Sequence, residues 1–371
     1  MNRSITLFDI ADALGISTGT VHRALHDHPG VSPMTRTKVL QMAKKLGYRP
    51  NLAARFLSSK RALRVSVNTL KGTTSFWDEV RAGIAEEAKS LLMENIELQF
   101  RTYPKLGEGE EEAFAAALKG QVDGIIVFPS SVQKLRPWIA RASRQKVPVI
   151  CVVTDAPDTA RLAVVSIDAS ASGALAADLM GRLLNGAGKV AVTLSALAIT
   201  EHADKCHAFE STLQAFYPNV HLVERVEDHD VEPEAYEKCR RLFEQHPDLS
   251  GMYVTTEASI PVVRAARDAQ VLDQLTIIAT DLFPGLVREI RSGAVLASIY
   301  QRPRTQGRMA FRALHEFLAE GQCPPYQITL APHLVMRGNL RFFLERQSVE
   351  EKSEREPQKP PVSRGFEERF A

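Results

Sequence analysis

The sequence predicts two structural parts, namely a small all-α domain and a larger α/β domain of two doubly wound parallel-sheet lobes. Three observations lead to this prediction. The first fifty residues hold three short amphipathic stretches with helix-capping residues. From residue 63 onward, short apolar stretches alternate with amphipathic stretches of ten or more residues. Finally, a chain of 371 residues is long enough for more than one hydrophobic core.

The first two helices of the small domain are indicated by their capping residues. We expect a helix from Leu7 to Leu14 with Thr6 as its N-cap. Gly15 ends this helix and provides the positive φ angle that a tight turn requires. Ser17 then caps a second helix, Thr18–Leu25. The spacing predicts two short helices joined by a tight turn.

A third helix and a short connector complete the small domain. Ser32 is the expected N-cap and Pro33 the first helical residue, while Gly47 ends the helix. A small core is expected from Ile10, Ala11, Val21, Leu25, Val31, Val39, Met42, Ala43 and Leu46. Residues 51–58 also have helical spacing, but so short a segment is only marginally helical alone in water.

The larger domain alternates strands and helices. Strands are expected near 64–69, 96–102, 122–128, 147–153, 163–167, 188–194, 220–226, 250–255, 275–280, 295–300 and 326–335. Helices are expected near 76–93, 110–119, 133–145, 172–185, 204–216, 233–246, 259–269, 284–292 and 304–320. This alternation is typical of parallel sheets covered by helices on both faces. Eleven strands exceed one comfortable open sheet, so two lobes are expected.

The charge distribution separates the two parts. The formal net charge is only +2, yet residues 1–64 carry eleven Lys and Arg against three acids. The remainder has 35 basic and 41 acidic residues and is therefore negative. A cationic module on an anionic body suggests that the module alone has a polyanionic partner.

Bulk features point to a cytoplasmic protein. No apolar run approaches the roughly 18 residues of a membrane span, and the start of the chain does not follow a signal-peptide pattern. The four cysteines are far apart and form no C-x-x-C pair, so we expect reduced thiols rather than disulfides or a metal site. Residues 345–371, rich in charge and proline, are expected to be a disordered tail, with an interaction arm as the alternative.

The N-terminal segment resembles the headpiece of the lactose-repressor (LacI/GalR) family of bacterial transcription regulators. The similarity covers ITLFDIADALGIS, TVHRAL, VSPMTRTKVLQMAKKLGYRPN and PNLAARFLSSKR, in order and with matching spacing. The resemblance implies a helix-turn-helix headpiece at 1–50, a hinge helix and linker at 51–62, and a sensor at 63–344. It also implies contacts to duplex DNA from Thr6, Ser17, Thr18, Gly19, Thr20, His22, Arg23, His26, Asn51, Ala54, Arg55 and Leu57.

Several of these residues suggest how the DNA would be recognised. Arg23 can form a bidentate pair with guanine, worth ~1–3 kcal/mol of discrimination. Thr18 and Gly19 are small where relatives usually carry larger base-reading residues, and His22 and His26 also depart from the family pattern, so the operator should differ from those of well-known relatives. By the resemblance, Leu57 is a wedge in the minor groove; alternatively it only anchors the linker.

Residues 64–340 resemble the type I periplasmic-binding-protein fold that this family carries as its sensor. The matching segments are Val122–Ile126, Val147–Ile150, Val165–Asp168 and Ala297–Gln301. The resemblance implies a small-molecule effector in a cleft between the two lobes, at the carboxyl ends of the strands. The implied contacts are Thr74, Phe76, Trp77, Asp155, Lys205, Thr256, Asp281 and Gln301. For the aromatic pair a core position is the alternative, and for the polar residues a cap or strand-end role.

A sugar or sugar derivative is the favoured effector, and a purine-like corepressor is the alternative. Lys205 stands where relatives usually have arginine, and Ala156 where ribose-type binders carry another. Because an ammonium is a point charge and not a planar fork, Lys205 cannot clamp vicinal hydroxyls in the same way. An acidic sugar derivative is also compatible with the sequence, because basic side chains are expected near the cleft, namely Lys205, His202 and Arg302.

Other functional classes fit the sequence less well. Gly186-Ala187-Gly188-Lys189-Val190 lacks the spacing and the Ser or Thr of a phosphate loop. No metal-cluster or nucleophile motif is present, so no enzymatic activity, cofactor or metal is expected. A transport-type sugar-binding protein shares the sensor fold but not the DNA-binding module. We therefore expect a regulator, a repressor in particular, that binds a near-palindromic operator as a homodimer, because one headpiece contacts too few bases for genomic specificity.

Overall fold

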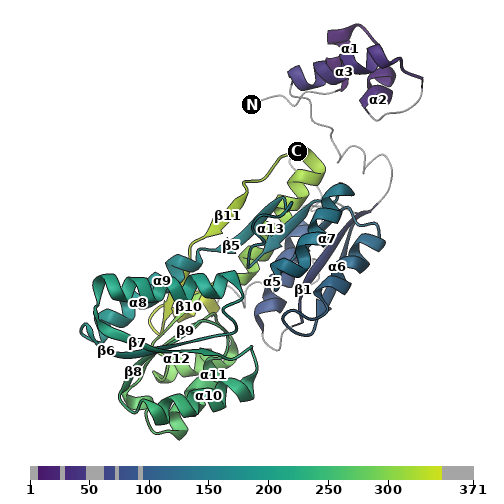
Figure 1. Cartoon of the computed structure of the whole chain (residues 1–371). Helices are drawn as coiled ribbons and strands as arrows, with labels where there is room; N and C mark the ends of the chain where they lie inside the picture. Colours follow the sequence, from purple (N-terminus) through teal and green to yellow (C-terminus); the bar gives the residue numbers. More distant parts are fainter. Residues whose placement is uncertain (1–6, 26–29, 47–61, 72–74, 91–94, 345–371) are drawn as a thin grey trace, which may run out of the picture. The chain divides into compact units, whose positions relative to one another are not determined.

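The protein is described here from a computed structural model, which describes residues 7–25, 30–46, 62–71, 75–90 and 95–344 (Figure 1). The expected hinge at 51–58 and the tail at 345–371 lie outside these residues. The chain divides into two compact units, the first comprising Met1–Ala169, Ala198–Ala203 and Arg302–Ala331, and the second the remainder. We call the α/β part of the first unit, from residue 62, lobe 1, and the second unit lobe 2. The headpiece is residues 7–46.

The headpiece contains the three predicted helices. They are α1 (Leu7–Leu14), α2 (Thr18–Leu25) and α3 (Pro33–Leu46). Gly15 has a φ angle of 63° and its amide donates to the carbonyl of Asp12, which confirms its role at the turn. Apolar residues from all three helices form one core, made by Ile10, Ala11, Val21, Ala24, Val39 and Ala43.

Lobe 1 is a parallel sheet of six strands among the described residues, in the order β11-β5-β4-β3-β1-β2. The strands are β1 (Leu63–Leu70), β2 (Ile96–Tyr103), β3 (Gly124–Val127), β4 (Val149–Val152), β5 (Ala163–Ile167) and β11 (Gln327–Leu330). The helices are α5 (Ser75–Ser90), α6 (Glu110–Lys119), α7 (Val132–Arg144) and α13 (Pro303–His315), the last continuing as a π-turn over Glu316–Glu320. One apolar cluster joins the sheet to α5 and α13, and another joins its opposite face to α6 and α7.

Two glycines allow α5 and α13 to pack closely. A Cβ atom on Gly307 would lie 2.1 Å from the carbonyl oxygen of Val80, and one on Gly83 would lie 2.0 Å from that of Arg304. Both distances are far below van der Waals contact. The two helix backbones can therefore meet only because neither position carries a side chain.

Lobe 2 is also a six-stranded sheet within the described residues, ordered β12-β10-β9-β8-β6-β7, with β12 antiparallel to β10 and the other pairs parallel. The strands are β6 (Ala187–Leu194), β7 (Asn219–Glu227), β8 (Leu249–Val254), β9 (Thr276–Thr280), β10 (Ala297–Tyr300) and β12 (His333–Met336). The helices are α8 (Ala169–Leu183), α9 (Thr200–Phe216), α10 (Glu232–Gln245), α11 (Ser259–Asp268) and α12 (Pro284–Ser292), with a short 3₁₀ turn, Leu272–Gln274.

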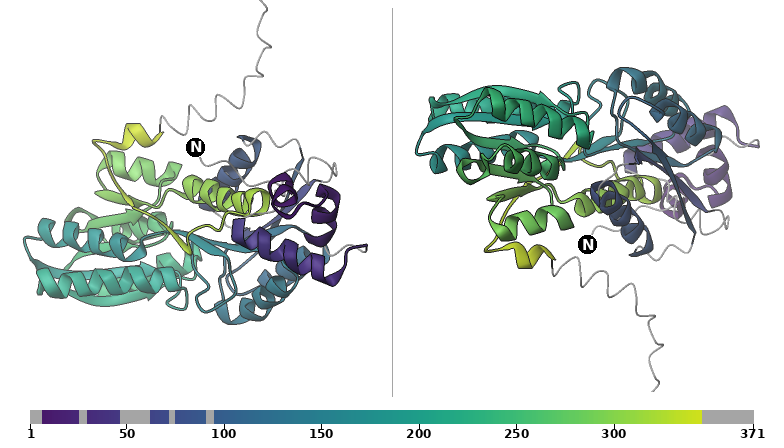
Figure 2. Two further views of the ribbon diagram at one scale, coloured as in Figure 1. Left: turned by 90° about the horizontal axis from the view of Figure 1, so that it is seen from above. Right: turned by 90° about the horizontal axis from the view of Figure 1, so that it is seen from below.

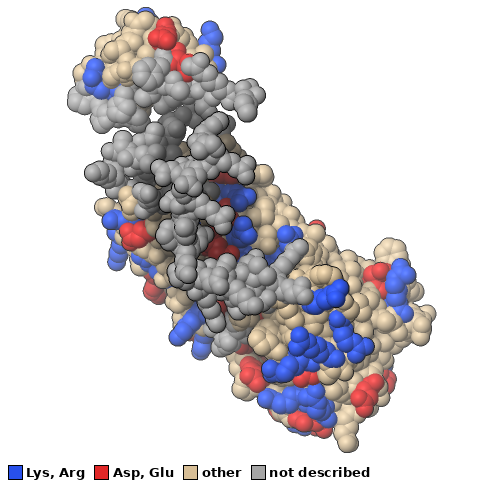
Figure 3. All heavy atoms as spheres, turned by 180° about the vertical axis from the view of Figure 1, so that it is seen from behind, with Lys and Arg blue, Asp and Glu red and all other residues tan. Residues whose placement is uncertain are grey.

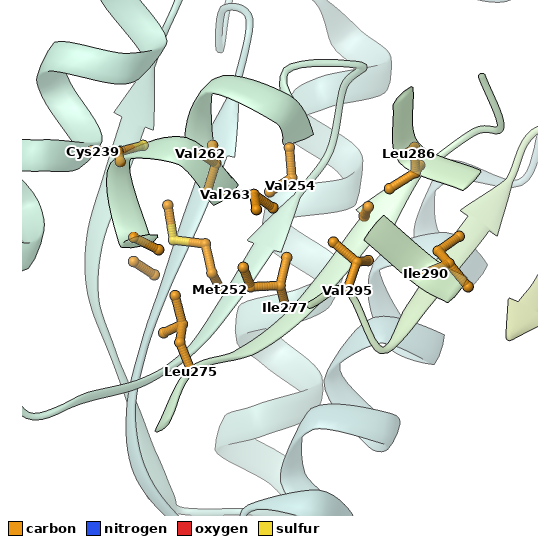
Figure 4. Packing of buried hydrophobic residues seen from close by; sticks show 14 of the residues in the cluster. Cys239, Met252, Val254, Val262, Val263, Leu275, Ile277, Leu286, Ile290 and Val295 are labelled. Carbon is orange, nitrogen blue, oxygen red and sulfur yellow. The ribbon is translucent and has the colours of Figure 1, made fainter. Parts of the chain in front are cut away.

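Helices cover both faces of the lobe 2 sheet (Figures 1 and 2). On one face, Met252 of β8 and Ile277 of β9 belong to a core that includes Val262 of α11 and Ile290 of α12 (Figure 4). On the other face, residues of α8 and α9 form a second cluster. Residues of both faces are apolar, which explains why the strands lack hydrophobic alternation.

The structure confirms the predicted fold class and corrects one strand. The stretch 326–335, predicted as a single strand, forms two strands in different lobes, β11 in lobe 1 and β12 in lobe 2. Ala331 and Pro332 separate them. Proline lacks an N–H donor and cannot take part in a strand ladder in the ordinary way, so the chain leaves one sheet before it joins the next.

Candidate nucleic-acid interface and effector site

The second helix of the headpiece presents a polar face. Ser17 caps α2, since the amide of Thr20 donates to Ser17 Oγ at 3.1 Å, as predicted. Gly19 and Arg23 are exposed, and Thr18 and Thr20 are partly exposed. Arg23 Nη2 donates to Thr20 Oγ1 at 3.4 Å, so the guanidinium lies along the surface of the helix. The same turn therefore presents hydroxyl groups and a cation to solvent.

The third helix is capped in the same way and adds positive charge. The amide of Thr35 donates to Ser32 Oγ at 3.2 Å, which confirms Ser32 as the N-cap. Lys44 and Lys45, in the last turn, are exposed. The other predicted DNA contacts lie outside the described residues; they are Thr6, His26, Asn51, Ala54, Arg55 and Leu57, together with the side chain of His22.

Lobe 2 contains a buried polar cluster, formed by Lys205, Thr255, Asp281 and Gln301. Lys205 Nζ donates to Gln301 Oε1 at 2.8 Å and to the carbonyl oxygen of Thr255 at 3.2 Å. Asp281 accepts from the backbone amide of Gln301 at 3.0 Å and from its Nε2 at 2.5 Å. Three of these residues were predicted to contact a ligand, and the structure brings them into one hydrogen-bonded chain.

The position of the cluster follows from the topology of lobe 2. Thr255 follows β8, Asp281 follows β9 and Gln301 follows β10, and these three strands are neighbours in the sheet. Because parallel strands end at the same edge, their next residues meet there. Asp281 has a left-handed φ angle of 64°, which aspartate tolerates better than most residues. Lys205 is added by α9.

The cluster is deeply buried for so polar a group. The exposed fractions are 0% for Lys205, 1% for Thr255, 2% for Asp281 and 6% for Gln301. A buried cation and a buried carboxylate are stable only with hydrogen-bonding partners. Asp281 fixes the amide of Gln301 so that its oxygen faces Lys205. This arrangement holds one donor-rich and one acceptor-rich group at the carboxyl edge of the sheet.

Two threonines at the end of β8 have different roles. Thr256 Oγ1 accepts from the amide of Ala258 at 3.3 Å, so its hydroxyl closes the turn that precedes α11, whose N-cap is Ala258 itself. Thr255, which the sequence did not single out, has a buried Oγ1 without a hydrogen-bond partner among the described residues. No local pattern distinguishes the two threonines, and both are buried in the structure.

The predicted aromatic contacts of lobe 1 lie in its core. Phe76 and Trp77 begin α5 and are 8% and 7% exposed. Their rings meet edge to face with centroids 5.1 Å apart, and Trp77 also packs on Phe128 at 4.5 Å. Thr74 lies outside the described residues. These contacts are those of the alternative interpretation, in which the pair stabilises the lobe.

Asp155 of lobe 1 is paired with an arginine of its own loop. Arg161 donates through Nε to Asp155 Oδ1 and through Nη2 to Oδ2, the latter at 2.7 Å. In the sequence, Ala156 and not an arginine follows Asp155 directly. In the structure the paired arginine is Arg161, six residues further along the chain.

Other features of the structure lie apart from the polar cluster of lobe 2. A hollow of about 350 Å³ in lobe 2 lies at the ends of α10 and α11 that face away from the carboxyl edge of the sheet; it is lined by Arg240, Phe243, Glu244, Pro247, Asp268, Ala269 and Val271. Lys189, of the glycine-rich segment, is ion-paired with Asp248 at 2.7 Å. Basic and acidic side chains lie near one another on the face drawn in Figure 3, as is typical of a solvated surface. Among the described residues, no His, Cys, Asp and Glu cluster could hold a metal ion.

Comparison with protein-family models gives two matches. Residues 6–51 match the family of bacterial regulatory proteins of the lacI family, and residues 65–322 match the periplasmic binding protein domain. The chain belongs to the LacI family of bacterial transcription regulators. It is therefore a DNA-binding regulator with an effector-binding type of sensor domain and, like its family, is not an enzyme.

Full-length relatives support the same assignment. Catabolite control protein A of Staphylococcus epidermidis is 26% identical over 344 residues, which is 90% of this chain and 99% of that protein. Catabolite control protein A of Priestia megaterium is 28% identical over 325 residues, or 85% of this chain and 93% of that protein. The LacI-family chain thus aligns with these regulators over both of its parts.

Solved structures resemble the sensor of this LacI-family protein in fold. A glucose-galactose binding protein of Geobacillus stearothermophilus has a TM-score of 0.70 at 23% identity and covers 76% of this chain and 99% of its own. A solute-binding protein of Burkholderia graminis in complex with D-arabinose has a TM-score of 0.71 at 21% identity, with 76% and 97% coverage. A putative LacI transcriptional regulator of Bacteroides fragilis has a TM-score of 0.70 at 17% identity, with 76% and 99% coverage.

The part of the chain that the structure describes contains no helix long and apolar enough to cross a bilayer.

Proposed function

We propose that this LacI-family regulator is a repressor that binds a near-palindromic operator as a homodimer. The observation that carries the proposal is the exposed face of α2, where Arg23 lies beside the hydroxyl of Thr20. Such a face suits the major groove, in which arginine reads guanine and hydroxyls bind phosphates or bases. Eleven basic residues among the first 64 supply the electrostatic part of the affinity. A cytoplasmic location on the nucleoid follows from this role.

The effector is proposed to be a sugar or sugar derivative bound between the two lobes. The proposal is supported by the cluster of Lys205, Asp281 and Gln301, because an ammonium, a carboxylate and an amide together can donate to and accept from sugar hydroxyls. It is also supported by the sugars named for proteins of similar fold, glucose and galactose in one case and D-arabinose in another. The other residues proposed to contact the effector are Thr74, Phe76, Trp77, Asp155 and Thr256.

The effector would act by changing the relative stability of two lobe arrangements. A ligand that binds one arrangement more tightly shifts the equilibrium by that difference in affinity and by no more. A hundredfold change in operator affinity therefore needs about 2.7 kcal/mol of differential binding. The proposed hinge at 51–62 would pass the change to two headpieces, with Leu57 as the wedge between bases.

A panel of small molecules tests the effector class. The purified full-length chain is first screened by thermal shift with D-glucose, D-galactose, D-arabinose and D-tagatose, and with hypoxanthine and guanine as purine probes. Binding to the folded state raises the midpoint by mass action. A shift with a sugar supports the proposal, whereas a shift with a purine alone contradicts the sugar assignment and supports the corepressor alternative.

Two lysine variants of lobe 2 then test the site. Lys205→Met removes the buried ammonium and keeps the aliphatic stem, and should abolish the sugar-dependent shift. Lys189→Met removes a surface lysine paired with Asp248 and serves as the matched control. A Lys205→Met protein that folds and still responds to the sugar as the wild type does would exclude Lys205 from the site.

Operator binding is tested with inverted-repeat DNA selected from a random pool. We expect an affinity that falls steeply with salt concentration, because basic residues displace counterions from phosphates. Leu57→Ala should lose most of the affinity with the fold retained. Sedimentation of the complex would give two protein chains per DNA; one chain per DNA at full occupancy would contradict the homodimer.

A further inference from the structure

Arg161 of lobe 1 joins two segments that are far apart in the sequence. It lies in the loop between β4 and β5, and its side chain has an exposed fraction of 0%. Two of its nitrogens donate to the carboxylate of Asp155, in the same loop. Its third, Nη1, donates to the carbonyl oxygen of Tyr326 at 3.0 Å. Tyr326 is the residue directly before β11.

The ring of Tyr326 completes the surroundings of the guanidinium. The Arg161 Cζ atom lies 3.8 Å from the centroid of this ring, which is itself half exposed. Guanidinium groups stack well on aromatic faces and present their donors in one plane, so a single arginine can bind a carboxylate, a carbonyl and a ring together. Lysine has neither the plane nor the fork. The contact therefore depends on arginine itself.

The backbone before Asp155 is held in an unfavourable conformation. Val153 has a φ angle of 73°, although β-branched residues rarely adopt this left-handed region. Its amide donates to the carbonyl of Val165 in β5 at 2.9 Å. Such a conformation persists only where the surroundings fix it, and it is often found at ligand sites and switches. The position of the Asp155 loop is thus specified by its contacts with β5 and with Arg161.

The strand that Tyr326 precedes, β11, is the last one of lobe 1 before the chain passes to lobe 2. β11 is an edge strand and pairs only with β5 in the sheet order of the described residues. The amide of Val164 donates to Tyr326 O at 3.1 Å, and that of Asp168 donates to Leu330 O at 2.8 Å. Ala331 ends the first unit, and Pro332 leads directly into β12 of lobe 2.

We propose that Arg161 is a positioning residue that holds the Asp155 carboxylate and ties it to β11, so that a change at Asp155 reaches the crossover to β12. The proposal rests on the proposed function for its meaning, since Asp155 would be the group that senses the effector. It goes beyond it in naming Arg161 and Tyr326 as the mechanical link. A sugar hydroxyl that competes for the carboxylate would weaken the Arg161 pair and release the start of β11.

Amide hydrogen exchange of the full-length protein tests the link without any ligand. We compare Arg161→Lys and Tyr326→Leu with the wild type, because the first loses the planar fork and the second loses only the stacked ring. Both should exchange about tenfold faster at the amides of Val164 and Asp168, which donate to the carbonyls of Tyr326 and Leu330. Both should also exchange faster in β12 (His333–Met336), which belongs to lobe 2.

The matched control is Arg182→Lys, which alters an arginine–aspartate pair with Asp178 on the surface of lobe 2. It should leave all of these amides unchanged. Faster exchange in lobe 1 with β12 unchanged would overturn the proposal, because Arg161 would then be only a local structural residue. Unchanged exchange at both positions would overturn it as well.

The two proposals can fail separately. If the wild type responds to none of the sugars while β12 still responds to Arg161→Lys, the effector class is wrong and the link stands. If a sugar binds and changes operator affinity equally in the wild type and in Arg161→Lys, the effector class stands and Arg161 is not part of the link.

Discussion

Asp228 should reduce the stability of lobe 2 at neutral pH. It follows β7 and is fully buried. Its Oδ1 accepts from the amide of Asp230 at 3.0 Å, whereas its Oδ2 has no hydrogen-bond partner within the described residues. Burial raises the pKa of Asp228 from 3.8 to about 7. The charges of Asp230 and Glu234 also raise it, whereas the hydrogen bond from the Asp230 amide and the charge of His229 lower it. Asp228→Asn removes the ionisation and keeps the shape.

The direction of the pH effect follows from proton binding. Below pH 3.8 the carboxyl is protonated in both the folded and the unfolded state. Between pH 3.8 and about 7 the folded state keeps its proton while the unfolded state has lost it, so the free energy of unfolding falls as pH rises. Above about pH 7 both are ionised and the penalty is constant. A shift of about three pH units corresponds to up to ~4 kcal/mol, which Asp228→Asn should recover at pH 8.

The assay must report on lobe 2. Thiol labelling of the buried Cys239 in α10, measured by mass spectrometry across a guanidinium titration at pH 5 and pH 8, follows this lobe. The tryptophans Trp77 and Trp138 both lie in lobe 1, so their fluorescence provides an internal control that should not change. We expect Asp228→Asn to raise the lobe 2 midpoint more at pH 8 than at pH 5.

A matched variant separates this effect from general loss of negative charge. Asp248 is exposed, and its pKa is lowered by the hydrogen bond and charge of Lys189, so Asp248→Asn should leave the slope between pH 4 and 7 as it is. If Asp228→Asn and the wild type lose lobe 2 stability in parallel between pH 5 and 8, the reasoning is refuted.

Three further predictions concern packing, DNA recognition and thiol chemistry. Gly307→Ala places a Cβ against the carbonyl of Val80 and should destabilise lobe 1 by about 1–3 kcal/mol in a denaturation followed by tryptophan fluorescence; a midpoint equal to that of the wild type would contradict the close helix contact. Arg23→Ala should relax the preference for one base in each half-site by ~1–3 kcal/mol in a competition assay, and a uniform loss across all sequences would instead indicate a phosphate contact. With a thiol reagent at pH 8, exposed Cys323 should react at once and the three buried cysteines only on unfolding; four fast thiols would contradict their burial.

The helices of the headpiece could be predicted from short stretches of sequence. Ser17 and Ser32 were predicted as caps, and the backbone amides of Thr20 and Thr35 donate to them. α1 and α2 have the predicted bounds. Such agreement is expected because capping, glycine turns and one apolar stripe act over a few residues and need no knowledge of the rest of the fold.

The hydrogen bonds of the candidate effector site could not be predicted from short stretches of sequence. Lys205, Asp281 and Gln301 could be named one at a time, but the hydrogen bonds that join them depend on the order of β8, β9 and β10 in the sheet. The tie between Arg161 and Tyr326 could not be found from the sequence, since 165 residues separate the two.

The amino-acid sequence by itself determined that this protein has a helical, cationic DNA-binding headpiece and an α/β sensor, because helix caps, strand periodicity and charge are properties of neighbouring residues. Only the tertiary structure decided that Phe76 and Trp77 pack in a core, that Arg161 pairs with Asp155, and that the stretch from 326 to 335 serves two lobes. The physical reason is that burial and pairing depend on which distant segment occupies the other side of a side chain, and the fold alone brings those segments together.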